Sequence, residues 1–138
     1  MARMIDHLSL GAADLDRAAR FYDVTLGALG YARLFTHPRA VGYGPPGARD
    51  ETFAVLATRD ATPCEGTHVA FAAPSREAVD AFHAAALAAG ARDEGAPGLR
   101  PQHGEGYYAA FARDLDGHRI EAVFHARRGD VTACTSAP

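Results

Sequence analysis

The sequence predicts an α+β fold made of two tandem βαβββ modules, whose sheets curl into an open, barrel-like cup. Two observations carry this prediction. A strand-like alternation followed by a helix-like apolar stripe occurs within residues 4–58. The same order of features recurs 61 residues further on, within residues 66–125. A repeat of this kind indicates a duplicated structural unit, and each unit should contribute one half of the cup.

Each module is expected to open with a short strand, over residues 5–10 and 66–71. In the first strand Leu8 and Leu10 alternate with polar neighbours, so apolar and polar side chains point to opposite faces. The repeat aligns His7 with His68, at equivalent places in the two strands. If the two modules pack with pseudo-twofold symmetry, the two imidazoles should face each other across the axis, inside the cup.

A helix should follow each opening strand. Asp14 and Ser75 are good N-cap residues, because their side-chain oxygens can accept a hydrogen bond from the first turn. Apolar residues recur at helical spacing after both caps. Gly30 and Gly90 then mark the helix ends, since glycine readily adopts the left-handed conformation that closes a helix.

Three further strands are expected in each module. The ranges are 31–36, 40–44 and 52–57 in the first module and 92–94, 107–113 and 119–125 in the second. Asp116-Gly117 is a strong turn signal between the last two strands. We therefore expect one domain over residues 1–125, followed by a fraying tail over residues 126–138.

Composition indicates an ordinary globular protein and excludes several functional classes. The chain has 138 residues, of which 48% are hydrophobic and 22% charged. A net charge of −3 argues against a nucleic-acid partner. The sequence lacks the run of about 18 apolar residues that spans a membrane. All 14 basic residues are arginine, which excludes Schiff-base chemistry, and two cysteines make no disulfide framework. We therefore expect a cytoplasmic protein.

His7, His68 and Glu121 form the main candidate site. Alternation in the last strand places Ile120 and Ala122 against the helices and Glu121 on the side of the histidines. Two imidazoles and a carboxylate on strands suit a divalent transition metal. The alternative is that each histidine is hydrogen-bonded packing, with no metal.

Other side chains are candidates for acid–base chemistry or substrate contact. His103 lies in a Gly-rich loop and could act as a general acid or base, although an exposed loop histidine would give the same pattern. An aromatic pocket for substrate could be lined by Tyr43, Phe53, Tyr107 and Tyr108. Core packing is the alternative for these four, because one face of each strand must be buried.

Four stretches carry a resemblance to a known family: Ile5-Asp6-His7-Leu8-Ser9-Leu10, Phe21-Tyr22 with Leu26-Gly27 and Leu29-Gly30-Tyr31, Gly66-Thr67-His68-Val69-Ala70-Phe71, and Asp114-Leu115-Asp116-Gly117-His118-Arg119-Ile120-Glu121. Over about residues 4–125 the chain resembles the vicinal oxygen chelate superfamily, which includes glyoxalase I, bleomycin-resistance proteins, fosfomycin-resistance enzymes and extradiol dioxygenases. Leu115 and His118 stand where that family usually has proline and asparagine.

The resemblance implies metal ligands on the first strand of each module and on the last strand of the second. These positions are His7, His68 and Glu121, and the implied cofactor is a divalent ion such as Zn, Ni, Fe or Mn. Glyoxalase I takes a fourth ligand from the last strand of the first module. Here that strand, residues 52–56, holds no Glu, Gln or His.

The resemblance also implies a function. We expect a metal-dependent lyase, isomerase or dioxygenase-like enzyme that binds a small organic substrate through two of its oxygens. The alternative is a metal-free protein that binds a small molecule or drug, like the bleomycin-resistance proteins. Family members of this length usually form homodimers, so a partner chain could complete the cavity.

Overall fold

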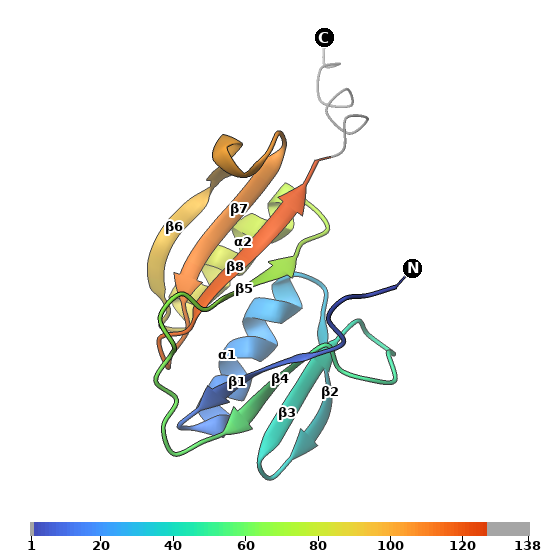
Figure 1. Ribbon diagram of the computed structural model, residues 1–138, viewed down its shortest axis with the longest axis vertical. Helices are drawn as coiled ribbons and strands as arrows, with labels where there is room; N and C mark the ends of the chain where they lie inside the picture. The colour runs from blue at the N-terminus through green and yellow to red at the C-terminus, as the bar shows by residue number, and fades with distance from the viewer. Residues whose placement is uncertain (1, 127–138) are drawn as a thin grey trace.

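Two βαβββ modules make up the computed structural model, which describes residues 2–126 (Figure 1). The first module contains β1 (Leu8–Ala12), α1 (Leu15–Ala28), β2 (Ala32–His37), β3 (Ala40–Gly44) and β4 (Phe53–Ala57). The second contains β5 (His68–Ala72), α2 (Arg76–Ala88), β6 (Arg92–Leu99), a short 3₁₀ helix η1 (Pro101–His103), β7 (Tyr107–Arg113) and β8 (Arg119–His125). Residues 127–138 of the predicted tail lie outside the described residues.

Each module forms its own four-stranded sheet. The strand orders are β1-β4-β3-β2 and β5-β8-β7-β6, so the two sheets have the same topology. In both sheets the first and last strands of the module pair in parallel, and the other pairs are antiparallel. The sheets remain open and separate, which confirms the predicted α+β fold of two tandem modules.

The predicted helix ends are confirmed. The Asp14 side chain accepts a hydrogen bond from the Arg17 backbone N–H at 3.0 Å, and Ser75 Oγ accepts one from the Ala78 N–H at 3.1 Å. Gly30 and Gly90 have φ angles of 89° and 101°, in the left-handed region that closes both helices.

Strand β6 is longer than the sequence predicts. The prediction of residues 92–94 was wrong because Gly95, Pro97 and Gly98 interrupt the alternation that marks a strand. β6 lies at the edge of its sheet and changes register twice, on either side of Gly95. An edge strand tolerates such bulges and a proline, because one side of it makes no sheet hydrogen bonds.

An aromatic core runs through both modules. The Tyr22 ring on α1 lies 5.0 Å from that of Phe53, which in turn lies 5.0 Å from that of Phe71 in β5. Phe71 then contacts Phe82 of α2, whose side chain is fully buried. The helices α1 and α2 also pack against each other. The modules are therefore held together on the helix-covered side of their sheets.

The turn between β7 and β8, residues 114–118, forms a second connection between the modules. The buried Asp114 carboxylate accepts a hydrogen bond from the Tyr22 hydroxyl, and His118 Nε2 lies 2.7 Å from the Gly11 carbonyl oxygen of β1. Two further hydrogen bonds join Arg17 to the Leu115 carbonyl and the Ala13 N–H to Asp116. His118, one of the departures from the usual family pattern, thus contacts the first module. We call residues 114–118 the inter-module turn.

Candidate functional site

The helix-free face of the second sheet gathers several of the side chains predicted for the site. Strand β5 pairs with β8 so that Ala70 lies opposite Glu121, and β7 pairs with β8 so that Tyr107 lies opposite His125. Because side chains alternate along a strand, His68, Glu121 and Tyr107 all project from this face. Ile120 and Ala122 face the helix, as predicted, and are buried.

Glu121 lies at the centre of this face and is only 1% exposed. One of its carboxylate oxygens, Oε1, accepts a short hydrogen bond from the Tyr107 hydroxyl. The other, Oε2, lies 3.2 Å from Nε2 of His68, whose side chain is about half exposed. The structure therefore brings together two of the three predicted ligands, and it adds a tyrosine that holds the carboxylate in place.

The hydroxyl of Tyr107 keeps its proton at neutral pH. Burial, together with the hydrogen bond and negative charge of Glu121, raises the pKa of Tyr107 to about 12. A phenolate beside a carboxylate would place two negative charges together, which disfavours ionisation. Tyr107 therefore remains a hydrogen-bond donor to Glu121 throughout the neutral range.

Two further histidines flank Tyr107. The ring of His103, in η1, lies 5.2 Å from the Tyr107 ring, and the ring of His125, at the end of β8, lies 5.0 Å from it. Both histidines are exposed. His125 joins this face because it is two strand periods from Glu121, so the alternation of the strand indicates its place. His103 lies beside Tyr107 in the 3₁₀ helix that precedes β7.

His7 is located elsewhere. It immediately precedes β1, in the first sheet, and its Nδ1 lies 2.8 Å from Asp6 Oδ1. The hydrogen bond to Asp6 raises the pKa of His7. Within residues 2–126 the structure shows no group of three His, Cys, Asp or Glu side chains that could hold one metal ion. A single chain therefore does not bring the three predicted ligands together.

The two sheets differ at the position of the carboxylate. Ser9 pairs with Ala54 in the first sheet as Ala70 pairs with Glu121 in the second, so Ala54 is the counterpart of Glu121. The first sheet thus carries an alanine methyl group where the second carries the carboxylate predicted as a ligand. The side chain of Ala54 offers no donor atom to a metal ion.

Three of the four aromatic residues predicted to contact substrate lie apart from Glu121. Tyr43 and Phe53 are 1% and 5% exposed and face α1, where the Tyr43 hydroxyl donates to the Ala19 carbonyl at 3.0 Å. Tyr108 projects from the opposite face of β7 to Tyr107, and its hydroxyl donates to Asp80 of α2 at 2.7 Å. Tyr43 and Phe53 do border a pocket of about 310 Å³ between the modules, whose lining also includes Tyr31, Pro45, Phe71 and Ala72.

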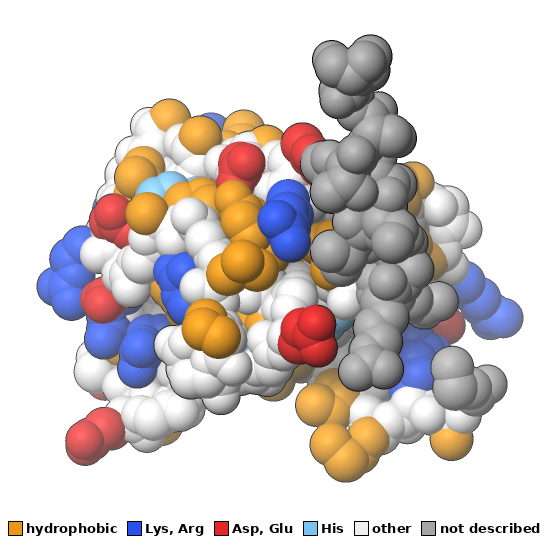
Figure 2. Space-filling view, turned by 90° about the horizontal axis from the view of Figure 1, so that it is seen from above, with side chains coloured by type: hydrophobic (Ala, Val, Ile, Leu, Met, Phe, Trp, Pro, Cys, Tyr) orange, Lys and Arg blue, Asp and Glu red, His pale blue; other side chains and the backbone are white. Residues whose placement is uncertain are grey.

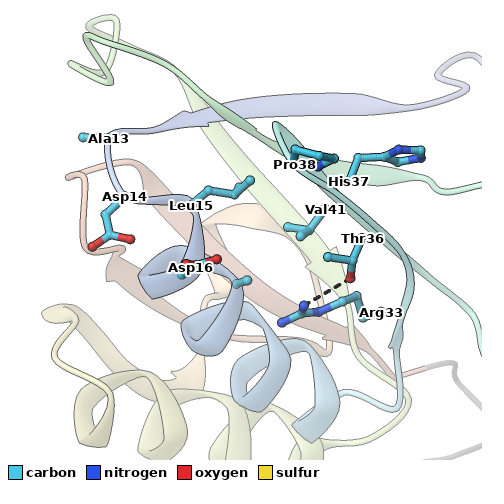
Figure 3. Close-up of a pocket in the computed structure, with 10 residues that line it drawn as sticks. Ala13, Asp14, Leu15, Asp16, Arg33, Thr36, His37, Pro38 and Val41 are labelled. Carbon is cyan, nitrogen blue, oxygen red and sulfur yellow. Dashed lines mark hydrogen bonds between the residues drawn. The ribbon is translucent and has the colours of Figure 1, made fainter.

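An open depression of about 710 Å³ lies between the start of α1 and the β2–β3 hairpin (Figure 3). The Arg33 guanidinium in its wall donates to Thr36 at 3.2 Å and forms an ion pair with Asp23 at 2.6 Å. None of the residues that line this depression is among the predicted site residues. Asp14 in the same wall caps α1 through the Arg17 N–H, so Arg33 and Asp14 are both engaged within the protein.

Acidic, basic and apolar side chains are interspersed on the face shown in Figure 2. Over the described part of the chain, the helices are too short or too polar to cross a membrane.

Comparison with protein families gives one match over most of the chain. Residues 4–122 match the model of the Glyoxalase/Bleomycin resistance protein/Dioxygenase superfamily. No curated protein matches the chain.

Solved structures share the fold. A glyoxalase/bleomycin resistance protein from Albidiferax ferrireducens T118 is 35% identical, with 88% of this chain and 98% of that chain covered and a TM-score of 0.75. A glyoxalase-related enzyme from Fulvimarina pelagi is 22% identical, with coverages of 89% and 88% and a TM-score of 0.68. The fosfomycin resistance protein FosX from Listeria monocytogenes is 17% identical, with coverages of 94% and 99% and a TM-score of 0.67. The last two show the fold alone.

Proposed function

Because the chain belongs to the Glyoxalase/Bleomycin resistance protein/Dioxygenase superfamily, we propose that it is a metal-dependent enzyme. Its substrate would be a small organic molecule bound through two neighbouring oxygens. The observation that carries the proposal is the buried carboxylate of Glu121 with the imidazole nitrogen of His68 3.2 Å away. Such a pair offers one oxygen and one nitrogen donor from adjacent strands.

The chemistry of these residues fits a divalent transition metal. A carboxylate this deeply buried is not needed to hold a sheet together, since apolar residues in place of buried ion pairs are often neutral or stabilising. Imidazole and carboxylate ligands suit Zn, Ni, Fe or Mn. Tyr107 donates to one oxygen of Glu121, which leaves the oxygen nearer His68 available as a ligand.

The third ligand in this proposal is His7 of the partner subunit in a homodimer. In Figure 1 both sheets turn their helix-free faces to the viewer, side by side, so they do not close on each other within the chain. A second copy related by a twofold axis would bring its first sheet over the second sheet of this chain. His7 is exposed, and donation from its Nδ1–H to Asp6 would leave Nε2 free to bind.

A bound metal ion would polarise the two substrate oxygens and stabilise the negative charge that develops on them. The residues of the chain have separate roles. His68 and Glu121 would hold the ion, and Tyr107 keeps the carboxylate oriented through its hydrogen bond. His103, whose ring lies 5.2 Å from that of Tyr107 at the exposed edge of the site, is the proposed general acid or base.

Glu121→Gln tests the metal site. Glutamine keeps the size of the side chain and still accepts the Tyr107 hydrogen bond, but it lacks the negative charge. Since loss of a group that only supports a ligand lowers metal affinity 10–100-fold, we expect Glu121→Gln to weaken metal binding by about a hundredfold or more. Titration calorimetry of tag-free, metal-free protein with Zn²⁺ or Mn²⁺ measures this, and Glu105→Gln, at an exposed position, is the control. Unchanged affinity in Glu121→Gln would contradict the site, and wild-type protein without metal affinity would favour the metal-free binding protein.

Mixing two variants that each lack one proposed metal ligand tests the shared site. His7→Ala and Glu121→Gln homodimers each lack a ligand in both sites. In a mixed dimer, Glu121 and His68 of the first variant would meet the intact His7 of the second, so one site of two is restored. We expect metal binding to return after the two proteins are mixed and allowed to exchange subunits. Light scattering that shows a single-chain mass, or mixed dimers that bind no metal, would contradict the shared site.

A further inference from the structure

Three arginines lie in one row across the second sheet, on the same face as Glu121. The strand register pairs Arg92 of β6 with Arg113 of β7, and Arg113 with Arg119 of β8. The next residue of the row, on β5, is His68. The row therefore leads directly to the proposed metal site.

This row is poorly neutralised. Like charges directly opposite each other on neighbouring strands are destabilising. Arg92 and Arg113 both donate to the same oxygen of Glu94, at 2.8 and 2.6 Å. Arg119 is exposed and makes no hydrogen bond or ion pair from its side chain to any residue in 2–126. One carboxylate thus neutralises two of the three guanidinium groups, and that of Arg119 has no partner within residues 2–126.

The row borders an open depression of about 500 Å³. Its other walls are the loop before β5 and the turn at Gly117, and the full lining is Pro63, Cys64, Glu65, Gly66, Thr67, Arg92, Arg113, Gly117 and Arg119. Glu65 is the second acidic residue at the depression, and its side chain is exposed. The guanidinium groups are therefore accessible from solvent through a recess of the size of a small ligand.

We propose that this arginine row binds an oxyanion group of the substrate, a carboxylate or a phosphoryl group. Guanidinium groups match the geometry of such anions and bind them with charge-assisted hydrogen bonds. Arg119 is adjacent to His68 across a strand pair, about 4.8 Å between backbones, and two residues, about 6.6 Å, from Glu121 along β8. A small molecule can span these distances.

The anion site extends the proposed function. Only one part of it rests on that function, namely that the bound anion belongs to the substrate. The net charge of the chain is −3, so the row is a local concentration of positive charge and not part of a generally basic surface. It would select acidic substrates and orient them with the anionic end away from the metal.

The test uses metal-free protein, so it does not depend on the metal site. Binding of inorganic phosphate and of malonate is measured by calorimetry and by NMR shifts of the β6–β8 amides. We expect Arg119→Ala to weaken binding by about tenfold or more, because it removes a charge-assisted donor that has no partner within residues 2–126. Arg119→Lys should bind with intermediate affinity. Arg20→Ala removes the same charge from an exposed site on α1 and should leave binding unchanged.

The outcomes separate the two proposals. Tight binding of phosphate alone identifies a phosphoryl group, and tight binding of malonate alone identifies a carboxylate. Binding of neither anion, or equal losses in Arg119→Ala and Arg20→Ala, overturns the anion site even if the protein binds metal. Glu121→Gln protein that binds the anion but no metal supports the arginine row by itself.

Discussion

Tyr107→Phe isolates the interaction that holds the buried carboxylate. The substitution keeps the aromatic ring and removes the hydroxyl that donates to Glu121. Because Glu121 is only 1% exposed, water cannot replace the lost donor. A hydrogen bond to a charged group contributes about 1.5–3 kcal/mol, so the free energy of unfolding should fall by about that amount.

The neighbouring tyrosine supplies a matched control. Tyr108 donates to Asp80, which is exposed and can be solvated when the hydroxyl is lost. We expect Tyr108→Phe to lower the free energy of unfolding by less than about 1 kcal/mol. Both variants lose one phenolic hydroxyl from the same strand, so the difference between them reports the burial of the acceptor.

Urea denaturation at pH 7 of metal-free protein measures both variants. The Glu121→Gln background gives a second comparison, because a neutral amide acceptor reduces the value of the Tyr107 hydrogen bond to about 0.5–1.5 kcal/mol. Equal losses in Tyr107→Phe and Tyr108→Phe would refute the reasoning. An unchanged effect of Tyr107→Phe in the Glu121→Gln background would show that the charge of Glu121 plays no part.

Three further results are expected. The pKa of Tyr107 is raised from 10.0 to about 12, so its contribution to stability is complete below pH 10 and is lost as the pH rises to about 12; alkaline difference spectra of wild type and Tyr107→Phe should show this late titration. His118→Ala should lower the free energy of unfolding by about 1–3 kcal/mol in urea, because the buried imidazole no longer meets the Gly11 carbonyl. Phe82→Ala should lower it by about 3–5 kcal/mol, since a fully buried ring is lost; a midpoint close to wild type for either would contradict the packing described.

Local patterns in the sequence predicted most of the fold, because helix caps and strand alternation depend on residues that are close together in the chain. Caps at Asp14 and Ser75 determine where the helices begin, and the bounds of β7 and β8 match the predicted ranges 107–113 and 119–125. The first strand was placed three residues early, since alternation continues into the approach to β1. The predicted range for β6 was too short because glycine and proline interrupt the alternation that marks a strand. The register of this edge strand depends on pairing with its neighbour and not on its own residues.

The candidate site was also predicted only in part. Strand period correctly grouped His68 with Glu121, because the two residues belong to neighbouring strands of one sheet. It could not place His7 relative to them, since the packing of one module on the other is decided by the helices and the aromatic core. Nor could it separate Tyr107 from Tyr108, which alternate on one strand, until the face covered by α2 was known.

The inter-module turn has a consequence for how the molecule unfolds. It joins the base of β8, the strand of Glu121, to β1, the strand that follows His7. Together with the shared aromatic core, it gives neither half a hydrophobic core of its own. The two repeats should therefore melt in a single cooperative transition, and a chain cut in the loop before β5 should fold only when both fragments are present. Two modules of the same topology would thus behave as one folding unit.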